Sequence, residues 1–226
     1  IGMQLEHIMI DDFQDTSNIQ WDNFKVLLQE CISHENAFNL IVGDVKQSIY
    51  RWRDGNWRLL NNLEKQFNSS QLNSQTLTKN YRSNSNIIRF NNDFFSFAKE
   101  EEYKALKADN PVEAEELQKA YADVVQLIPE RNKEERGLVK VKLINSKSEA
   151  YHRETLELVA NQVQALLNAG IAENQIAILV RTNPIIQEIG DYFMEYMPHV
   201  RLVSDEAFHL DASLAVNIMI DAMRVI

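Results

Sequence analysis

The chain has 226 residues, of which 45% are hydrophobic and 25% are charged, so it can bury one large or two small cores and is not disordered throughout. Its formal net charge of -10 argues against a protein that coats nucleic acid indiscriminately, although it does not exclude binding along a single cationic groove. Cys31 is the only cysteine, which excludes an intrachain disulfide and a zinc site of the CxxC type and favours a reducing cytoplasm. No stretch approaches the roughly 20 apolar residues that a membrane span requires, so we expect no membrane partner.

The first part of the chain is predicted to alternate strands with helices, in the order strand 5–10, helix 18–31, strand 37–42 and helix 55–67. Both strands are short apolar runs typical of a buried parallel sheet, and carboxylates follow each of them closely. Asp15, Thr16 and Ser17 are candidate N-caps of the first helix. The polar residues 68–74 indicate a loop and a domain boundary. Because Ile1 lies almost at the first strand, we expect the chain to be a piece of a longer protein.

The second part of the chain is predicted to continue this alternation. Its expected elements are a short strand at Leu77, a helix after residues 83–85, a charge-rich helical segment within 100–136, strand 138–144, helix 149–168, strand 176–180, a helix from Pro184, strand 200–203 and helix 211–225. Ser83 and Ser85 are candidate caps of the first of these helices, and the charge-rich segment is predicted to be helical around 114–127. Strands that alternate with helices imply an α/β fold with mainly parallel sheets.

Two carboxylates, Asp11 and Asp12, follow the first predicted strand. Ligands of open α/β sheets bind at the carboxyl ends of the strands, where one carboxylate can hold Mg²⁺ and its neighbour can activate a water molecule. A simpler alternative is that these residues only cap the helix that follows. A calcium loop fails, because Thr16 and Asp22 stand where that loop needs a glycine and a bidentate glutamate.

The second predicted strand leads into Gly-Asp-Val-Lys-Gln-Ser-Ile-Tyr-Arg-Trp-Arg at residues 43–53. Aromatic side chains interleaved with arginines form a surface that can stack the bases and pair the phosphates of single-stranded nucleic acid. The alternative is that Tyr50 and Trp52 belong to a hydrophobic core or an interface. A third motif, Asn-Tyr-Arg-Ser at residues 80–83, combines a stacking side chain with a phosphate-binding one, and a structural role is again the alternative.

Together these motifs resemble those of one family, the superfamily-1 DNA helicases of the UvrD/Rep type. Residues 11–16 resemble helicase motif II, residues 43–53 resemble motif III and residues 80–83 resemble motif IV. Residues 176–183 are similar to the strand with Arg-Thr-Asn in the second motor domain of that family. Motif III is the most specific match, and it is more similar to the AddA/RecB-like helicase-nuclease branch than to UvrD or Rep.

This resemblance implies an α/β fold made of parts of two RecA-like parallel-sheet motor domains of the P-loop NTPase type. The C-terminal part of the first, ATP-binding domain would cover residues 1–72. The N-terminal part of the second would cover residues 73–226, with a charged helical insertion near 98–136. The sequence contains no Gly-x-x-x-x-Gly-Lys-Ser/Thr loop, so the chain by itself is expected to have little or no ATPase or unwinding activity.

The resemblance also implies that Mg²⁺ and ATP are the cofactors. Asp11 would hold Mg²⁺, and Asp12 would activate the attacking water, although the family normally has a glutamate at the second position. The aspartate is one methylene shorter, so we expect weak or water-bridged hydrolysis.

Four further side chains would contact ATP, as the resemblance implies. Gln14 and Gln47 would sense the attacking water and the γ-phosphate, and Tyr81 would stack on the adenine ring. Arg82 would act as an arginine finger that stabilises charge on the transferring phosphate. The expected catalytic residues are therefore Asp12, Gln47 and Arg82.

The DNA-binding residues that the resemblance implies lie in two places. Tyr50 and Trp52 would stack on bases, and Arg51 and Arg53 would serve DNA phosphates or ion pairs that link the two sites. From the second domain, the contacts to the single strand would come from Arg181 and Asn183. After residue 53 the family often has Gly-Ala, whereas this chain has Asp-Gly.

The leading hypothesis is therefore an ATP-dependent DNA helicase, of which this chain is a fragment. Its expected partners are single-stranded and duplex DNA and a helicase-nuclease partner subunit. The alternative is a non-catalytic module that binds nucleic acid or another protein and retains only the helicase fold. The shortened carboxylate at Asp12 favours the alternative, and the presence of Gln47 and Arg82 favours the helicase.

Overall fold

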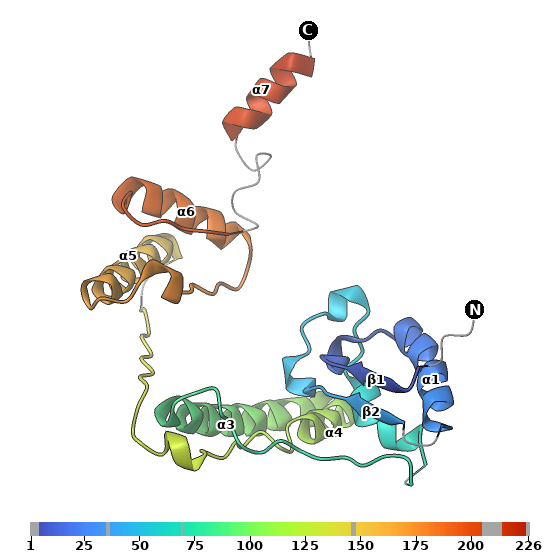
Figure 1. The fold of residues 1–226 in the computed structure, drawn as a ribbon. Coiled ribbons are helices and arrows are strands. Elements are labelled where there is room, and N and C mark those ends of the chain that lie inside the picture. The colour runs from blue at the N-terminus through green and yellow to red at the C-terminus, as the bar shows by residue number, and fades with distance from the viewer. Residues whose placement is uncertain (1–4, 35–36, 69, 146–147, 205–213, 225–226) are drawn as a thin grey trace. The chain divides into compact units, whose positions relative to one another are not determined.

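The computed structural model describes residues 5–34, 37–68, 70–145, 148–204 and 214–224 (Figure 1). The chain divides into two compact units, Ile1–Lys140 and Val141–Ile226, and each is described by itself. No helix within the described ranges is both long enough and apolar enough to cross a membrane.

The first unit begins with two parallel strands joined by a helix (Figure 1). Strand β1 spans His7–Ile10, helix α1 spans Asn18–Ile32 and strand β2 spans Phe38–Ile41. The register places Ile10 opposite Ile41, so both strands end at the same edge of the sheet. The predicted parallel pairing is confirmed, and within the described residues it comprises these two strands.

Helix α1 begins with a capping box. The Ser17 hydroxyl accepts a hydrogen bond from the Gln20 backbone N–H at 3.2 Å, and the Gln20 side chain accepts one from the Ser17 N–H at 2.9 Å. These two bonds satisfy donors that a helix start leaves unpaired, and such a cap contributes roughly 0.5–2 kcal/mol. Of the three predicted N-caps, Ser17 is the one that the fold uses.

The core of this region lies on one face of the two strands. It centres on buried Phe13, Trp21, Leu28 and Leu63, and the inward residues of both strands pack against it. The Phe13 and Trp21 rings meet edge to face at 4.9 Å. On the other face the strands are exposed, with Met9 at 74% relative accessibility. The prediction that these strands are buried is therefore wrong for this face and holds for the face that packs on the core.

The single helix predicted over 55–67 is also wrong. The chain instead forms the short helix α2, Arg58–Asn61, followed by a 3-10 turn at Leu63–Lys65. The backbone of Asn62 leaves the helical region, with φ -110° and ψ 8°. Asparagine has a low helix propensity, and a pair of them at 61–62 explains why the helix stops there.

Two packed helices follow in the same unit, α3 at Ser85–Asp109 and α4 at Pro111–Ala120 (Figure 1). Asn84 is the N-cap of α3, so the prediction that Ser83 or Ser85 caps it is wrong. The Ser85 hydroxyl is buried and donates instead to the carbonyl oxygen of Glu134 at 2.6 Å. Helix α4 ends at Ala120, so the helix predicted to reach residue 127 is shorter than expected.

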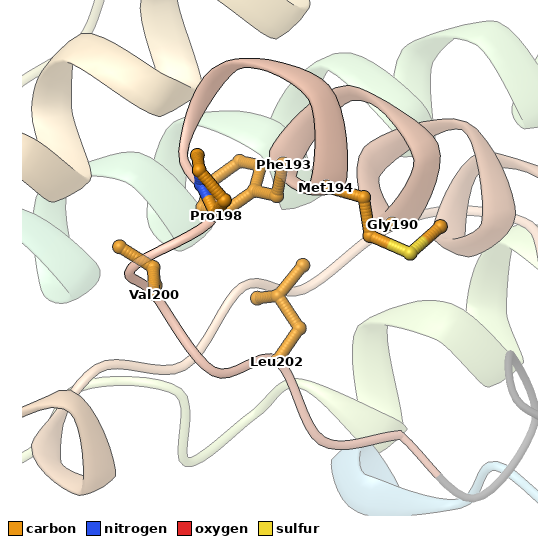
Figure 2. Close-up of a pocket in the computed structure, with 6 residues that line it drawn as sticks. All are labelled: Gly190, Phe193, Met194, Pro198, Val200 and Leu202. Carbon is orange, nitrogen blue, oxygen red and sulfur yellow. The ribbon is translucent and has the colours of Figure 1, made fainter.

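The second unit contains helices α5, Ser148–Asn168, and α6, Pro184–Tyr196, as predicted. They share a core around buried Phe193. A small pocket lies between α6 and the chain that follows it, and Figure 2 shows its six lining residues: Gly190, Phe193, Met194, Pro198, Val200 and Leu202. This lining offers no ionisable side chain, so we do not treat the pocket as a candidate site. Helix α7 spans Leu214–Arg224, and the predicted start of that helix at residue 211 lies outside the described residues.

Four predicted strands do not form in the described chain: the one at Leu77 and those at 138–144, 176–180 and 200–203. The nearest feature to the first is an isolated parallel bridge between Lys79 and Leu127. A strand requires a neighbouring strand to complete its ladder of backbone hydrogen bonds, and within the described residues no such ladder includes these segments. Leu179 accordingly has a relative accessibility of 95%.

Candidate functional site

The ends of the two paired strands bring the first two sequence motifs together. Beyond the strands, the Val42 N–H donates to the Ile10 carbonyl oxygen at 2.8 Å, and the Phe13 N–H donates to the Val42 carbonyl oxygen at 3.0 Å. These bonds fix the chain after β1 against the chain after β2. The carboxylates at Asp11 and Asp12 and the residues that follow β2 therefore lie at one edge of the sheet.

Asp12 has a left-handed backbone, with φ 49° and ψ 38°. Its N–H donates to the Asp11 side chain at 2.9 Å. Aspartate and asparagine tolerate this conformation better than longer side chains do, because their short polar groups can bond locally. The backbone thus gives a physical reason for aspartate at this position, and both carboxylates remain exposed.

Gln14, a buried residue that is 2% exposed, joins the two motifs through its side-chain amide. Its oxygen accepts a hydrogen bond from the Asp44 backbone N–H at 3.0 Å, and its nitrogen donates to the Asp12 carboxylate at 3.3 Å. Gly43 makes room for this amide, since a Cβ atom there would lie 2.8 Å from the Gln14 oxygen.

Asp44 extends the network to the second motif. Its Oδ2 atom accepts a hydrogen bond from the Gln47 side chain at 3.1 Å. Its Oδ1 atom accepts from the Lys46 backbone N–H at 3.0 Å and forms an ion pair with the Lys46 ammonium at 2.8 Å. Burial by itself would raise the pKa of Asp44, but the hydrogen bonds from Lys46 and Gln47 outweigh it and lower that pKa. An ionised Asp44 therefore orients the Gln47 amide.

These bonds make one continuous network from Asp12 through Gln14 and Asp44 to Gln47. Three of the predicted ATP-site residues are thus brought together, and Asp11 adjoins them through the N–H of Asp12. Within the described residues, no group of three or more His, Cys, Asp or Glu side chains is arranged to hold a metal ion.

The aromatic part of the second motif forms an exposed group. The rings of Tyr50 and Trp52 lie 6.1 Å apart, and the Arg53 guanidinium lies 4.3 Å from the centre of the Trp52 ring and 5.5 Å from that of Tyr50. Trp52 is 71% exposed, so the alternative that it is a core residue does not hold in this structure. Arg51 is also exposed.

A tight turn ends this aromatic group. Asp54 has a left-handed backbone with φ 62°, and the Gly55 N–H donates to the Tyr50 carbonyl oxygen at 3.1 Å. A Cβ atom at Gly55 would lie 2.9 Å from that same oxygen. The Asp-Gly pair, which differs from the usual family pattern, therefore fits a turn that requires glycine at its second position.

The third motif is held by residues that follow α4. The Arg131 guanidinium lies 4.8 Å from the centre of the Tyr81 ring and donates to the Tyr81 carbonyl oxygen at 3.0 Å. Both Tyr81 and Arg82 are exposed. Within the described residues the Arg82 side chain forms no hydrogen bond or ion pair, so the structure does not bring it into contact with Asp11 or Gln47.

Arg181 and Asn183 belong to the second compact unit. Both are exposed, and Asn183 is the N-cap residue of α6. The DNA-binding role that the resemblance implies for them therefore stays a prediction.

Sequence reasoning missed several residues that hold the site: Asp44, Lys46, Asp123, Gln126 and Arg131. Asp44 and Lys46 lie inside the second motif, but their roles depend on side-chain contacts that the sequence does not specify. The others lie in the charge-rich segment, where nothing in the local pattern marks a partner 46 or more residues away.

Two family matches cover most of the chain. Residues 1–68 match the UvrD/REP helicase N-terminal domain, and residues 75–212 match the UvrD-like helicase C-terminal domain. Together they define a DNA helicase class whose two domains follow one another in this chain. The chain belongs to the UvrD-like helicase family.

The relatives found among curated proteins are helicase-nuclease subunits. The chain is 30% identical over 238 residues to an ATP-dependent helicase/nuclease subunit of Lactococcus lactis subsp. cremoris (strain SK11), with 98% of this chain and 18% of the relative covered. It is 27% identical over 231 residues to the subunit of the same name from Streptococcus pneumoniae (strain Hungary19A-6), with 99% and 18% covered. The expected resemblance to the helicase-nuclease branch is confirmed, and the chain spans 18% of the length of these relatives.

Proposed function

We propose that this chain is part of an ATP-dependent DNA helicase that couples the hydrolysis of Mg²⁺-bound ATP to movement along single-stranded DNA. The observation that carries the proposal is the hydrogen-bond network from Asp12 through Gln14 and Asp44 to Gln47. It gathers acidic and amide side chains at the ends of two parallel strands, which is where α/β sheets bind their ligands. Relatives that carry the name of ATP-dependent helicase/nuclease subunits support the assignment.

The carboxylates suit a Mg²⁺ ion that arrives with a nucleotide. Mg²⁺ commonly takes one or two carboxylates, with water and phosphate oxygens as its other ligands, so a protein cluster of three acids is not needed. Asp11 would hold the ion and Asp12 would activate the attacking water. When bound, Mg²⁺ neutralises charge on the phosphates.

The amides and the third motif complete the ATP site in this proposal. Gln14 and Gln47 position the attacking water and the γ-phosphate, and their mutual anchor, Asp44, keeps both amides in fixed orientations. Tyr81 stacks on the adenine ring. Among the described residues no side chain pairs with the Arg82 guanidinium, which leaves it available as an arginine finger that reaches the phosphate only when the motor domains close.

We further propose that two RecA-like motor domains meet near residue 72, with residues 1–72 in the first and 73–226 in the second. The interval between the two family matches supports this boundary. Hydrolysis would then be tied to domain closure, since the first domain supplies Asp12 and Gln47 and the second supplies Arg82. In the 226 residues no glycine-rich phosphate loop occurs, so the chain alone should hydrolyse little ATP.

The DNA strand would lie on the exposed aromatic group. Tyr50 and Trp52 would stack on bases, while Arg51 and Arg53 would pair with phosphates. Stacking tolerates any sequence, which suits a motor that steps along arbitrary DNA. Arg181 and Asn183 would add contacts from the second domain, and a helicase-nuclease partner subunit in the cytoplasm would complete the assembly.

The decisive experiment measures DNA-stimulated ATP turnover by the full-length protein. Gln47→Ala and Arg82→Ala should each lower the turnover number by about 100-fold or more, as loss of a group that stabilises transition-state charge does. Gln75→Ala, at an exposed position outside the motifs, is the matched control and should be unchanged. Full turnover by both motif variants would overturn the proposal.

A second candidate is a nucleic-acid-binding module without catalysis, which the short side chain at Asp12 favours. The same assay separates the two functions. A full-length protein that binds DNA but shows no DNA-stimulated turnover would support the binding module. A phosphate-binding loop encoded upstream of residue 1 would support the helicase.

A further inference from the structure

Residues 121–127, here called the linking segment, contact the third motif from one side. The Leu127 N–H donates to the Thr78 carbonyl oxygen at 2.7 Å, and the Asn80 N–H donates to the Leu127 carbonyl oxygen at 3.0 Å. The Asn80 side chain also donates to the Gln126 side chain at 2.7 Å. The linking segment therefore fixes the backbone just before Tyr81 and Arg82.

The same segment is anchored to α3. The side chain of Asn92, on that helix, donates to the Gln126 carbonyl oxygen and accepts from the Gln126 N–H, both at 2.9 Å. The Asn92 amide thus pairs with both backbone groups of Gln126, as a neighbouring strand would. It makes the linking segment a defined structure although it forms neither helix nor strand.

The other end of the linking segment contacts the second motif. The Asp123 carboxylate lies 2.7 Å from the Lys46 ammonium, which also pairs with Asp44 at 2.8 Å. The Lys46 side chain is 17% exposed and Asp123 is 48% exposed. A lysine that is mostly covered and shared between two carboxylates has little rotational freedom. Asp123 is thus connected through Lys46 to Asp44, whose carboxylate accepts the hydrogen bond from the Gln47 amide.

A second ion pair joins the same two regions. Arg58, in α2, pairs with Glu116 of α4 in a bidentate arrangement, with nitrogen–oxygen distances of 2.6–3.2 Å. Two separate pairs thus connect α4 and the linking segment to residues 46–58. In each pair the basic residue comes from the region matched by the N-terminal helicase domain and the acid from the region matched by the C-terminal one.

We propose that the linking segment couples the loop that carries Gln47 to the loop that carries Arg82, with Asp123 as a positioning residue that acts through Lys46 and Asp44. This inference rests on the proposed ATPase function. In this proposal Asp123 acts only through its contact with Lys46. Its effect is to keep the Gln47 amide oriented while the same segment fixes the backbone ahead of Arg82.

The test is ATP turnover by the full-length protein with saturating DNA. Asp123→Asn should lower kcat by about 3- to 10-fold, less than the hundredfold that a 1 Å misplacement can cost, with KM for ATP unchanged. Asp123→Glu keeps the charge and should restore most of the turnover. Asp93→Asn, an exposed aspartate on α3, is the matched control and should leave kcat unchanged. Asp123 is the half-exposed member of its pair, and Lys46 keeps Asp44 as a partner in the variant, so the melting temperature should change little.

Epistasis then separates positioning from a general structural role. In a Gln47→Ala background, Asp123→Asn should cause no further loss of single-turnover hydrolysis, because its target is already absent. Two outcomes would overturn this inference while leaving the proposed function intact. In the first, Asp123→Asn lowers hydrolysis equally in the wild-type and Gln47→Ala backgrounds. In the second, Asp123→Asn retains wild-type kcat although Gln47→Ala is slow. Full turnover in Gln47→Ala would instead overturn the proposed function. Failure of Asp123→Glu to restore turnover would show that charge is not what Asp123 contributes, and would also overturn the inference.

Discussion

The side-chain oxygen of Gln14 accepts a hydrogen bond from the backbone N–H of Asp44 at 3.0 Å. This bond crosses from the chain that follows β1 to the chain that follows β2. Because the Gln14 amide is buried, the bond is shielded from water, and its loss would leave polar groups without partners. Gly43, which directly precedes Asp44, leaves the space that the amide occupies.

Gly43→Ala should therefore destabilise the chain by about 1–3 kcal/mol, because the new methyl group displaces the Gln14 amide or the neighbouring Leu60 side chain. Gly190→Ala is the matched control, since a Cβ atom there meets nothing within 4 Å and the residue lies inside α6. That substitution should stabilise the chain by about 0.5–1 kcal/mol. The free energy of unfolding, measured in urea, checks both signs. Equal effects of the two substitutions would contradict the steric argument.

The stability that the charge of Asp44 contributes should appear as a pH-dependent difference between the wild type and Asp44→Asn. The pKa of Asp44 is lowered from its ordinary value of 3.8, although burial opposes the shift, because Lys46 and Gln47 bond to the ionised form. A carboxyl with a lowered pKa stabilises the fold above its unfolded pKa, and this stabilisation is lost as pH falls through its folded pKa. The free energy of unfolding of the wild type should thus exceed that of the variant by about 1–2 kcal/mol at pH 6–7. This difference should become smaller as pH falls below 3.8. A gap that stays constant down to pH 3 would rule out the charged interaction as its source.

Substitutions at Asp12 should separate chemistry from backbone strain. Asp12→Asn should leave the melting temperature nearly unchanged, because asparagine also tolerates the left-handed backbone, while ATP turnover by the full-length protein should drop by about 100-fold or more. Asp12→Glu restores the usual family residue and should preserve or raise turnover, at some cost in stability. Thermal unfolding and steady-state turnover measure the two properties independently. If Asp12→Asn retained full turnover, Asp12 would not be the base.

Trp52→Ala should weaken the binding of single-stranded DNA to the full-length protein. Loss of one stacked base contact corresponds to about 1–3 kcal/mol, or roughly a 5- to 150-fold rise in Kd. Trp52→Phe keeps a stacking ring and should retain most of the affinity. Phe97→Ala removes a ring of similar exposure, 66% against 71%, from α3 and should have no effect. Anisotropy of a labelled oligothymidine without ATP provides the measurement, and a loss of affinity shared by the Trp52 and Phe97 alanine variants would argue against a specific stacking role.

Local signals predicted the parts of the fold that depend on neighbouring residues. Apolar runs predicted the first strand and the helix that follows it, and a polar residue before that helix predicted its N-cap, Ser17. All three are present in the structure. The strand predicted at 176–180 has the same kind of apolar run but lacks a partner strand among the described residues, so it stays unpaired. Strand formation is decided by pairing, which a local pattern does not contain.

The candidate site divides in the same way. The sequence motifs predicted that Gln14 and Gln47 belong to the ATP site, and the structure connects both side chains through hydrogen bonds to Asp44. The contact between Lys46 and Asp123 spans 77 residues, and no spacing rule connects a lysine in a turn to one acid among many in a charged segment. Only the three-dimensional arrangement could select that pair.

The parallel register of β1 and β2 makes the assembly of the site depend on a helix that contributes no side chain to it. Parallel neighbours cannot be joined by a tight hairpin, so the chain from Ile10 must travel through α1 before Ile41 can take its place opposite. A proteolytic cut in α1, or a proline in its middle, should therefore disconnect Gln14 from Asp44 while leaving every motif residue intact.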